Sequence, residues 1–171
     1  MSVQNVQALS EVNVYINVTS QPDINHILKI FQQTLPVSNN SIAYTIVPRG
    51  LIISIAEDKF FYGDSIKLTE EGQELLYKIS QGLNNLKNNC AIESHTDEQF
   101  PEKSIYKDDW EISINRATVI ANFLTRYCNI EKKRLFPIGF GNSMPFRETV
   151  SPRDFTDSRI DFVIFDYAYK R

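Results

Sequence analysis

Two segments, CAIESHTD (Cys90–Asp97) and DWEISINRA (Asp109–Ala117), decide how this sequence folds. The apolar start of the first predicts a short strand that delivers its polar residues to the strand's carboxyl end. A charged loop follows, and the second segment opens a long amphipathic helix. A strand that ends in Asp97, followed by a helix with Arg116 in its first turns, can hold one negative and one positive side chain over the same rim. That arrangement suits a zwitterionic ligand.

The bulk composition excludes several classes of protein. The chain has 171 residues and 42% hydrophobic residues, which predicts one packed domain with a short appendage. Its net charge of −3, with both signs interspersed, gives no cationic surface for nucleic acid or anionic lipid. We see no run of about 18 apolar residues and no signal-peptide pattern.

The remaining elements follow from periodicity and from turn residues. A helix over 22–35 and one from an N-cap at Thr69 to about 86 each present one apolar face. Strands are predicted over 42–47, 51–56, 134–141 and 159–167, with an extended arm or strand over 12–18. The first two form a hairpin, and Pro137 predicts that the third lies at an edge or a bulge. Together these elements predict an α/β (α+β) sandwich, in which helices cover one face of a mixed sheet.

The two cysteines leave two interpretations open. Cys90 begins the central strand and Cys128 ends the helix after it. A helix that returns along the sheet brings its end near the start of the preceding strand, so a disulfide is conceivable. We favour two separate buried thiols, because the sequence does not supply the spacing that a bridge requires.

An ordered set of motifs resembles a known family. These are Phe61-x-Gly63, Ser94-His95-Thr96-Asp97, Trp110-Glu111-Ile112-Ser113 with Arg116-Ala117, Gly139-x-Gly141 with Pro145, and Arg159-Ile160-Asp161. Over roughly residues 48–167 they resemble the OmpA-like peptidoglycan-binding domain. The helix start and Gly50-Leu51-Ile52-Ile53 most resemble the version in MotB, the stator protein of the flagellar motor.

The resemblance implies an architecture and a setting. Residues 48–171 would form the OmpA-like domain, a βαβαβ mixed sheet with helices on one face, and residues 1–47 a helical and extended stator-type extension. MotB proteins carry an amino-terminal membrane helix that this chain does not show. We therefore expect a periplasmic fragment of a homodimeric motility protein, anchored in the inner membrane, with its membrane stator partner, through a segment absent here.

The resemblance also implies a binding site without catalysis, cofactor or metal. The ligand would be the stem peptide of peptidoglycan, whose diaminopimelate ends in an ammonium and a carboxylate on one carbon. Asp97 would receive the ammonium and Arg116 would grip the carboxylate with its planar fork, with Thr96 and Arg159 beside them. Replacing Asp97 or Arg116 by Ala should then abolish wall binding with little change in melting temperature.

Three departures from the family pattern bear on this site. Ser94 stands where the family has Gly, which we expect to add a side chain close to the site. Asp157-Ser158-Arg159 replaces Asn-Arg-Arg, which adds a negative charge and removes a positive one. The charged loop 98–108 could also gate the site.

Other interpretations stay beside this one. The domain could anchor another envelope complex, such as a secretion system or a lipoprotein. A hydrolase using His95 and Asp97 is disfavoured, because we find no nucleophile elbow, paired catalytic carboxylates or zinc motif. A metal site at His95 with Glu93, Asp97 or His26 is disfavoured by the spacing. Trp110 is expected to pack at the helix start rather than to stack on sugar.

Overall fold

The computed structural model describes residues 23–35, 42–97, 104–144 and 157–166 of the chain. Within these ranges the strands form one five-stranded sheet in the order β1-β2-β5-β3-β4. The strands are β1 (Ile42–Val47), β2 (Gly50–Ala56), β3 (Cys90–His95), β4 (Leu135–Gly141) and β5 (Arg159–Phe165). Only the β3–β4 pair is parallel, and β4 lies at an edge, as Pro137 predicted.

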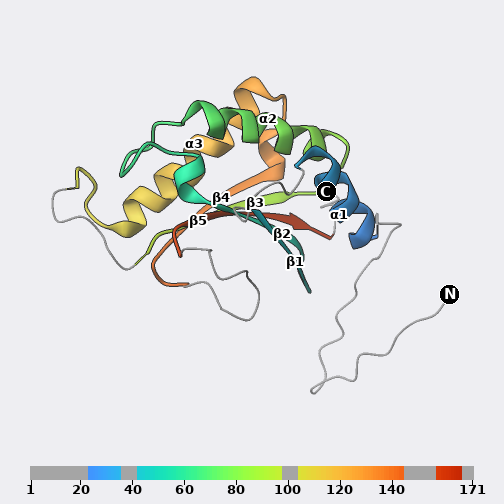
Figure 1. Cartoon of the computed structure of the whole chain (residues 1–171), viewed down its shortest axis with the longest axis horizontal. Helices are drawn as coiled ribbons and strands as arrows, with labels where there is room; N and C mark the ends of the chain where they lie inside the picture. The colour runs from blue at the N-terminus through green and yellow to red at the C-terminus, as the bar shows by residue number, and fades with distance from the viewer. Residues whose placement is uncertain (1–22, 36–41, 98–103, 145–156, 167–171) are drawn as a thin grey trace, which may run out of the picture.

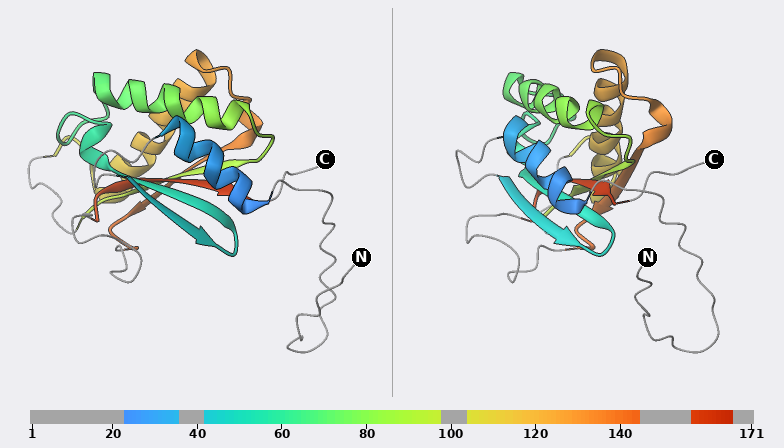
Figure 2. Two further views of the ribbon diagram at one scale, coloured as in Figure 1. Left: turned by 45° about the vertical axis from the view of Figure 1, so that its right-hand side comes forward. Right: turned by 90° about the vertical axis from the view of Figure 1, so that its right-hand side faces the viewer.

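The helices of the described residues lie on one face of this sheet (Figures 1 and 2). They are α1 (Ile24–Thr34), α2 (Glu70–Asn84) and α3 (Asp109–Tyr127), with short 3₁₀ turns η1 (Glu57–Lys59) and η2 (Lys132–Arg134). Thr69 begins α2 as predicted, because its hydroxyl accepts a hydrogen bond from the backbone N–H of Gly72 at 2.8 Å. Asp108 caps α3 in the same way, accepting from the N–H of Glu111 at 2.8 Å.

Strand alternation builds the core between the helices and the sheet. Ile53, Phe162 and Ile92 lie opposite one another on β2, β5 and β3, and all three are fully buried. Burying an aliphatic or aromatic side chain of this size stabilises the fold by about 1.5–3 kcal/mol. This layer holds the strands in register and fixes which residues stand at their ends.

The structure refines the predicted boundaries by one or two residues. The first helix begins at Ile24, the second ends at Asn84, and the last strand is described up to Phe165. The predicted arm over 12–18 lies outside the described residues. Both cysteines are buried and free, so the favoured interpretation of separate thiols is confirmed.

The described part of the predicted amino-terminal extension, residues 23–35 and 42–47, joins the same sheet and core as the rest. β1 pairs with β2 along its whole length, and α1 packs against α2. Packing is therefore continuous across residue 47, and the domain boundary placed there stays a prediction. In the part of the chain that the structure describes, no helix has the length and apolarity to cross a membrane.

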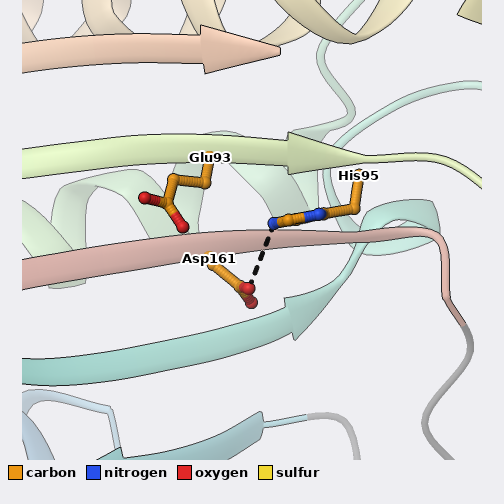
Figure 3. A group of neighbouring side chains, drawn as sticks. All are labelled: Glu93, His95 and Asp161. Atoms are coloured by element: carbon orange, nitrogen blue, oxygen red, sulfur yellow. Dashed lines mark ion pairs between the residues drawn. The ribbon is translucent and has the colours of Figure 1, made fainter. Parts of the chain in front are cut away.

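The sheet face opposite the helices carries a buried polar layer at the β3–β5 pair. Glu93 lies opposite Asp161, and His95 lies opposite Arg159. Figure 3 shows the Glu93, His95 and Asp161 side chains converging, with His95 Nε2 at 3.3 Å from Asp161 Oδ2. The Arg49 guanidinium donates to both carboxylate oxygens of Glu93, at 2.6 and 2.9 Å. Arg159 Nε donates to Asp161 at 3.0 Å.

This layer pairs each buried charge with an opposite one. Burial alone would raise the pKa of the Asp161 carboxyl, but His95 and Arg159 beside it hold that pKa below its ordinary value. Removing one member would leave a charge buried without compensation, which is far more costly than losing an exposed pair.

We therefore predict that Arg159→Ala lowers the free energy of unfolding by about 3–5 kcal/mol, because Asp161 loses its guanidinium partner. Urea denaturation measures the change. Arg126→Ala, on the exposed side of α3, is the matched control and should change stability by no more than about 0.5 kcal/mol. Equal small effects of both substitutions would contradict a structural role for Arg159.

Candidate functional site

The candidate site forms where three strand ends meet. Arg159 at the start of β5 lies opposite Ala56 at the end of β2 and opposite His95 at the end of β3. The residues just beyond these ends are linked through Ser158. Its carbonyl accepts from the N–H of Glu57 at 3.2 Å, and its hydroxyl accepts from the N–H of Asp97 at 3.0 Å. In Figure 1 this end of the sheet lies at the left, where α3 begins.

A pocket of about 250 Å³ opens at this junction. Four carboxylates and one guanidinium line it, together with polar and apolar side chains: Glu57, Asp58, Asp64, Asp97, Arg116, Thr96, Ser158, Phe61 and Ile112, with Gly63. Its volume suits a head group rather than a whole drug-sized ligand. The excess of carboxylates makes its wall strongly acidic.

Three of the four predicted site residues meet at this pocket. Asp97, Thr96 and Arg116 all line it, although they come from a strand end and from a helix. Asp97 is exposed, whereas the Thr96 Oγ1 atom is buried with no hydrogen-bond partner among the described residues. A buried hydroxyl without a partner at a pocket wall is available to a ligand.

Arg116 forms the inner wall of the pocket, and most of its donors already have partners. Its Nη2 donates to the Gly63 carbonyl at 2.8 Å and lies 2.9 Å from Glu57 Oε1. Its Nε donates to the Ser65 carbonyl at 3.1 Å, and its guanidinium carbon lies 5.3 Å from the centre of the Phe61 ring. Only Nη1 has no partner among the described residues. With 3% of its surface exposed, Arg116 is a structural residue as well as a candidate site residue.

This corrects one expectation about Arg116. The sequence interpretation treats it as a side chain whose removal leaves the melting temperature nearly unchanged. Because its guanidinium ties α3 to the loop at Gly63 and Ser65, and to η1 through Glu57, Arg116→Ala would also weaken the fold. Asp97, exposed at the pocket mouth, is the cleaner residue for testing binding.

The Gly139-x-Gly141 motif explains how α3 comes close enough to place Arg116. A Cβ on Gly139 would lie 2.5 Å from the backbone nitrogen of Ile114, so only glycine permits this approach. Gly141 N–H donates to the Ser113 hydroxyl at 3.0 Å, and its carbonyl accepts from Thr96 N–H at 2.9 Å. These two bonds join the start of α3 to the end of β3.

Glu57, Asp58 and Asp64 line the pocket but are not among the residues predicted from the sequence, and Glu57 is the one in contact with Arg116. Glu57 directly follows the predicted strand 51–56, so the sequence places it at a strand end. The sequence does not predict which other elements lie beside that end. Burial raises the pKa of Glu57 to about 7, the guanidinium of Arg116 opposes the rise, and Asp58, Asp64 and Asp97 reinforce it. Glu57 therefore changes charge near neutral pH while in contact with Arg116.

Arg159, the fourth predicted site residue, does not line the pocket. Its guanidinium is buried and donates to Asp161, to the Asp157 carbonyl at 3.1 Å and to the Met144 carbonyl at 3.3 Å. Strand alternation turns it to the sheet face opposite the helices, where it serves the buried polar layer.

The structure also differs from the expectations for Ser94 and Trp110. Ser94 pairs with Gly139, which packs against α3, so the Ser94 side chain lies in the core rather than at the pocket. Trp110 lies close to Gly141 at the start of α3, but it is only partly packed, with 55% of its surface exposed. The loop residues 98–103 lie outside the described ranges.

A metal could find ligands in the described residues only at Glu93, His95 and Asp161, whose donor atoms lie within 4.8 Å of one another (Figure 3). This set differs from the combinations considered from the sequence. Guanidinium groups already engage both carboxylates, so a cation would have to displace Arg49 or Arg159 or lie beside them. The charges fit an internal network better than a metal centre.

The raised pKa of Glu57 predicts a pH-dependent stability. Between its ordinary value of 4.5 and about 7 the folded protein binds more protons than the unfolded chain, so stability falls as pH rises through this range. The loss attributable to Glu57 is on the order of 2–3 kcal/mol. Denaturation at pH 5, 6, 7 and 8 should show Glu57→Gln gaining stability relative to the parent as pH rises.

Glu131→Gln is the control for this measurement. Glu131 is also paired with a cation, Lys133 at 2.7 Å, but on the surface. The stability of Glu131→Gln, plotted against pH, should run parallel to that of the parent chain. A Glu57→Gln curve parallel to the parent as well would show that Glu57 does not titrate in this range.

Comparison with known proteins agrees with the fold. Similar solved structures include a MotB-like protein of Desulfovibrio vulgaris (TM-score 0.71, 20% identity, 84% of this chain and 91% of that chain). The cell wall anchor of the type VI secretion system of Pseudomonas aeruginosa is also similar (TM-score 0.67, 20% identity, 86% and 100%). So is the periplasmic domain of Helicobacter pylori MotB (TM-score 0.66, 16% identity, 78% and 85%).

Sequence comparison gives one curated relative and a family. The protein YtxE of Bacillus subtilis is 24% identical over 117 residues, which is 68% of this chain and 48% of YtxE. The chain thus spans about half the length of this relative. The OmpA family matches residues 60–159, more than half of the chain, and this range contains Asp97, Arg116 and the glycine motif. The chain therefore belongs to the OmpA family, and its fold is that of the OmpA-like domains of MotB proteins.

Proposed function

We propose that this chain is a non-catalytic module that binds the stem peptide of peptidoglycan and so anchors a flagellar motor stator to the cell wall. The observation that carries the proposal is the pocket itself. Asp97 follows β3 and Arg116 lies on α3, and both line one small pocket together with Thr96, whose hydroxyl is buried.

The pocket chemistry supports an amino-acid head group as the ligand. In the proposed complex the carboxylate of Asp97 receives the ammonium of diaminopimelate, and charge-assisted bonds of this kind are short and directional. Arg116 Nη1 donates to an oxygen of the carboxyl group attached to the ammonium-bearing carbon, and Thr96 Oγ1 forms a further hydrogen bond with the ligand. The neighbouring carboxylates strengthen the attraction for the ammonium.

The stator role rests on the similarity to MotB proteins. We place the chain in the periplasm, as a homodimer joined to its membrane stator partner by an inner-membrane segment that precedes it, with no part in nucleic-acid binding. Sedimentation of the chain at micromolar concentration tests the dimer. A full-length gene with a single amino-terminal membrane helix would support the stator assignment.

A second candidate is a wall anchor of another envelope complex. The observation that favours it is the similarity to the solved cell wall anchor of the Pseudomonas aeruginosa secretion system, a solved chain that this chain covers completely. Both candidates share the wall-binding pocket and differ in the partner. Loss of motility without loss of secretion, after deletion of the gene, would favour the stator.

We predict that Asp97→Asn reduces co-sedimentation with purified peptidoglycan at least about tenfold, because the ammonium loses its charged acceptor. The melting temperature should change little, since Asp97 is exposed. Glu74→Gln, an exposed carboxylate of α2 outside the pocket, is the matched control and should sediment as the parent does.

Two outcomes would contradict the proposal. Full co-sedimentation of Asp97→Asn would show that the pocket does not carry binding. Release of soluble fragments from the wall during incubation would show a hydrolase rather than a binding module.

A further inference from the structure

The guanidinium of Arg116 is already engaged by a carboxylate of its own chain. Nη2 lies 2.9 Å from Glu57 Oε1 and also donates to the Gly63 carbonyl, while Nε donates to Ser65. A bidentate grip on a ligand carboxylate uses either Nε with Nη2 or Nη1 with Nη2. Both pairings need Nη2, so Glu57 occupies the position that a ligand carboxylate would take.

The remaining charges around that position are also negative. Asp58 from η1, Asp64 from the loop before α2 and Asp97 just after β3 face Glu57 along the pocket wall. Among the described lining residues, Arg116 is the only cation. A ligand carboxylate entering here would lie beside these groups. Like charges brought together at an interface lower the affinity strongly.

We propose that Glu57 selects the ligand, so that the pocket binds an ammonium group beside a neutral carboxamide in preference to one beside a free carboxylate. This inference rests on the proposed function and specifies its ligand as a stem peptide whose diaminopimelate is amidated on the ammonium-bearing carbon. The carboxamide oxygen accepts from Arg116 Nη1, and the carboxamide N–H₂ donates to Glu57. Asp97 receives the ammonium in both cases.

The same contact makes selection dependent on pH. When Glu57 is protonated it releases Nη2, and a free carboxylate can then take its place on Arg116. Because the pKa of Glu57 is raised to about 7, the exchange falls near neutral pH. Binding of the free acid above pH 7 should therefore take up as much as about one proton, whereas binding of the amide should take up none.

The test uses two synthetic stem peptides that differ only in this group, carboxylate or carboxamide, titrated calorimetrically into the 171-residue chain at pH 6 and pH 8.5. At pH 8.5 the parent should bind the amide about tenfold or more tightly than the acid. At pH 6, where Glu57 is largely protonated, the ratio should be clearly smaller. Glu57→Gln should show the smaller ratio at both pH values, and Glu131→Gln should behave as the parent.

The pH dependence of the parent tests the inference even if Glu57→Gln fails to fold. Equal binding of the two peptides at pH 8.5, tighter binding of the acid, or an unchanged ratio in a folded Glu57→Gln would overturn it. If the parent co-sediments with peptidoglycan while any of these holds, the proposed function stands and only the selection by Glu57 falls. If neither peptide binds and nothing co-sediments, both fall.

Discussion

The contacts of Arg116 are the interaction on which the rest of the site depends. One guanidinium joins α3 to the loop at Gly63 and Ser65 and to the turn that follows β2 through Glu57. A buried guanidinium is costly unless most of its donors are paired, so the loop and the turn must hold their positions for α3 to pack. The pocket is the space left beside this arrangement, and its shape is therefore set by the same contacts that stabilise the fold.

Much of this could be predicted from the sequence, for a local reason. The strand Cys90–His95 and the helix Asp109–Tyr127 are neighbours in the chain, so placing Asp97 and Arg116 at one rim needed only the direction of each element. Glu57 could not be placed in this way. Its contact with Arg116 depends on β2 lying beside β5 and β5 beside β3, an order that periodicity does not reveal.

Arg159 was predicted to lie beside the binding site, from its place in the family motif, but it does not line the pocket. It stands at a strand end beside the pocket, and one-residue alternation decides which face receives its side chain. The sheet pairs it with His95 and Asp161 on the face opposite the helices. Adjacent residues thus serve different purposes: Ser158 links the pocket walls, and Arg159 neutralises a buried acid.

The two groups of charges differ in how completely they are balanced. In the buried layer each carboxylate has a guanidinium of its own, Arg49 for Glu93 and Arg159 for Asp161. At the pocket one guanidinium faces four carboxylates, one of which is partly buried and binds protons near neutral pH. An excess of negative charge costs stability unless a cation arrives, so the fold itself favours an ammonium-bearing ligand at this end of the sheet. Glu57 adds selectivity to that attraction, because every ligand group that seeks Arg116 must compete with a carboxylate already in place.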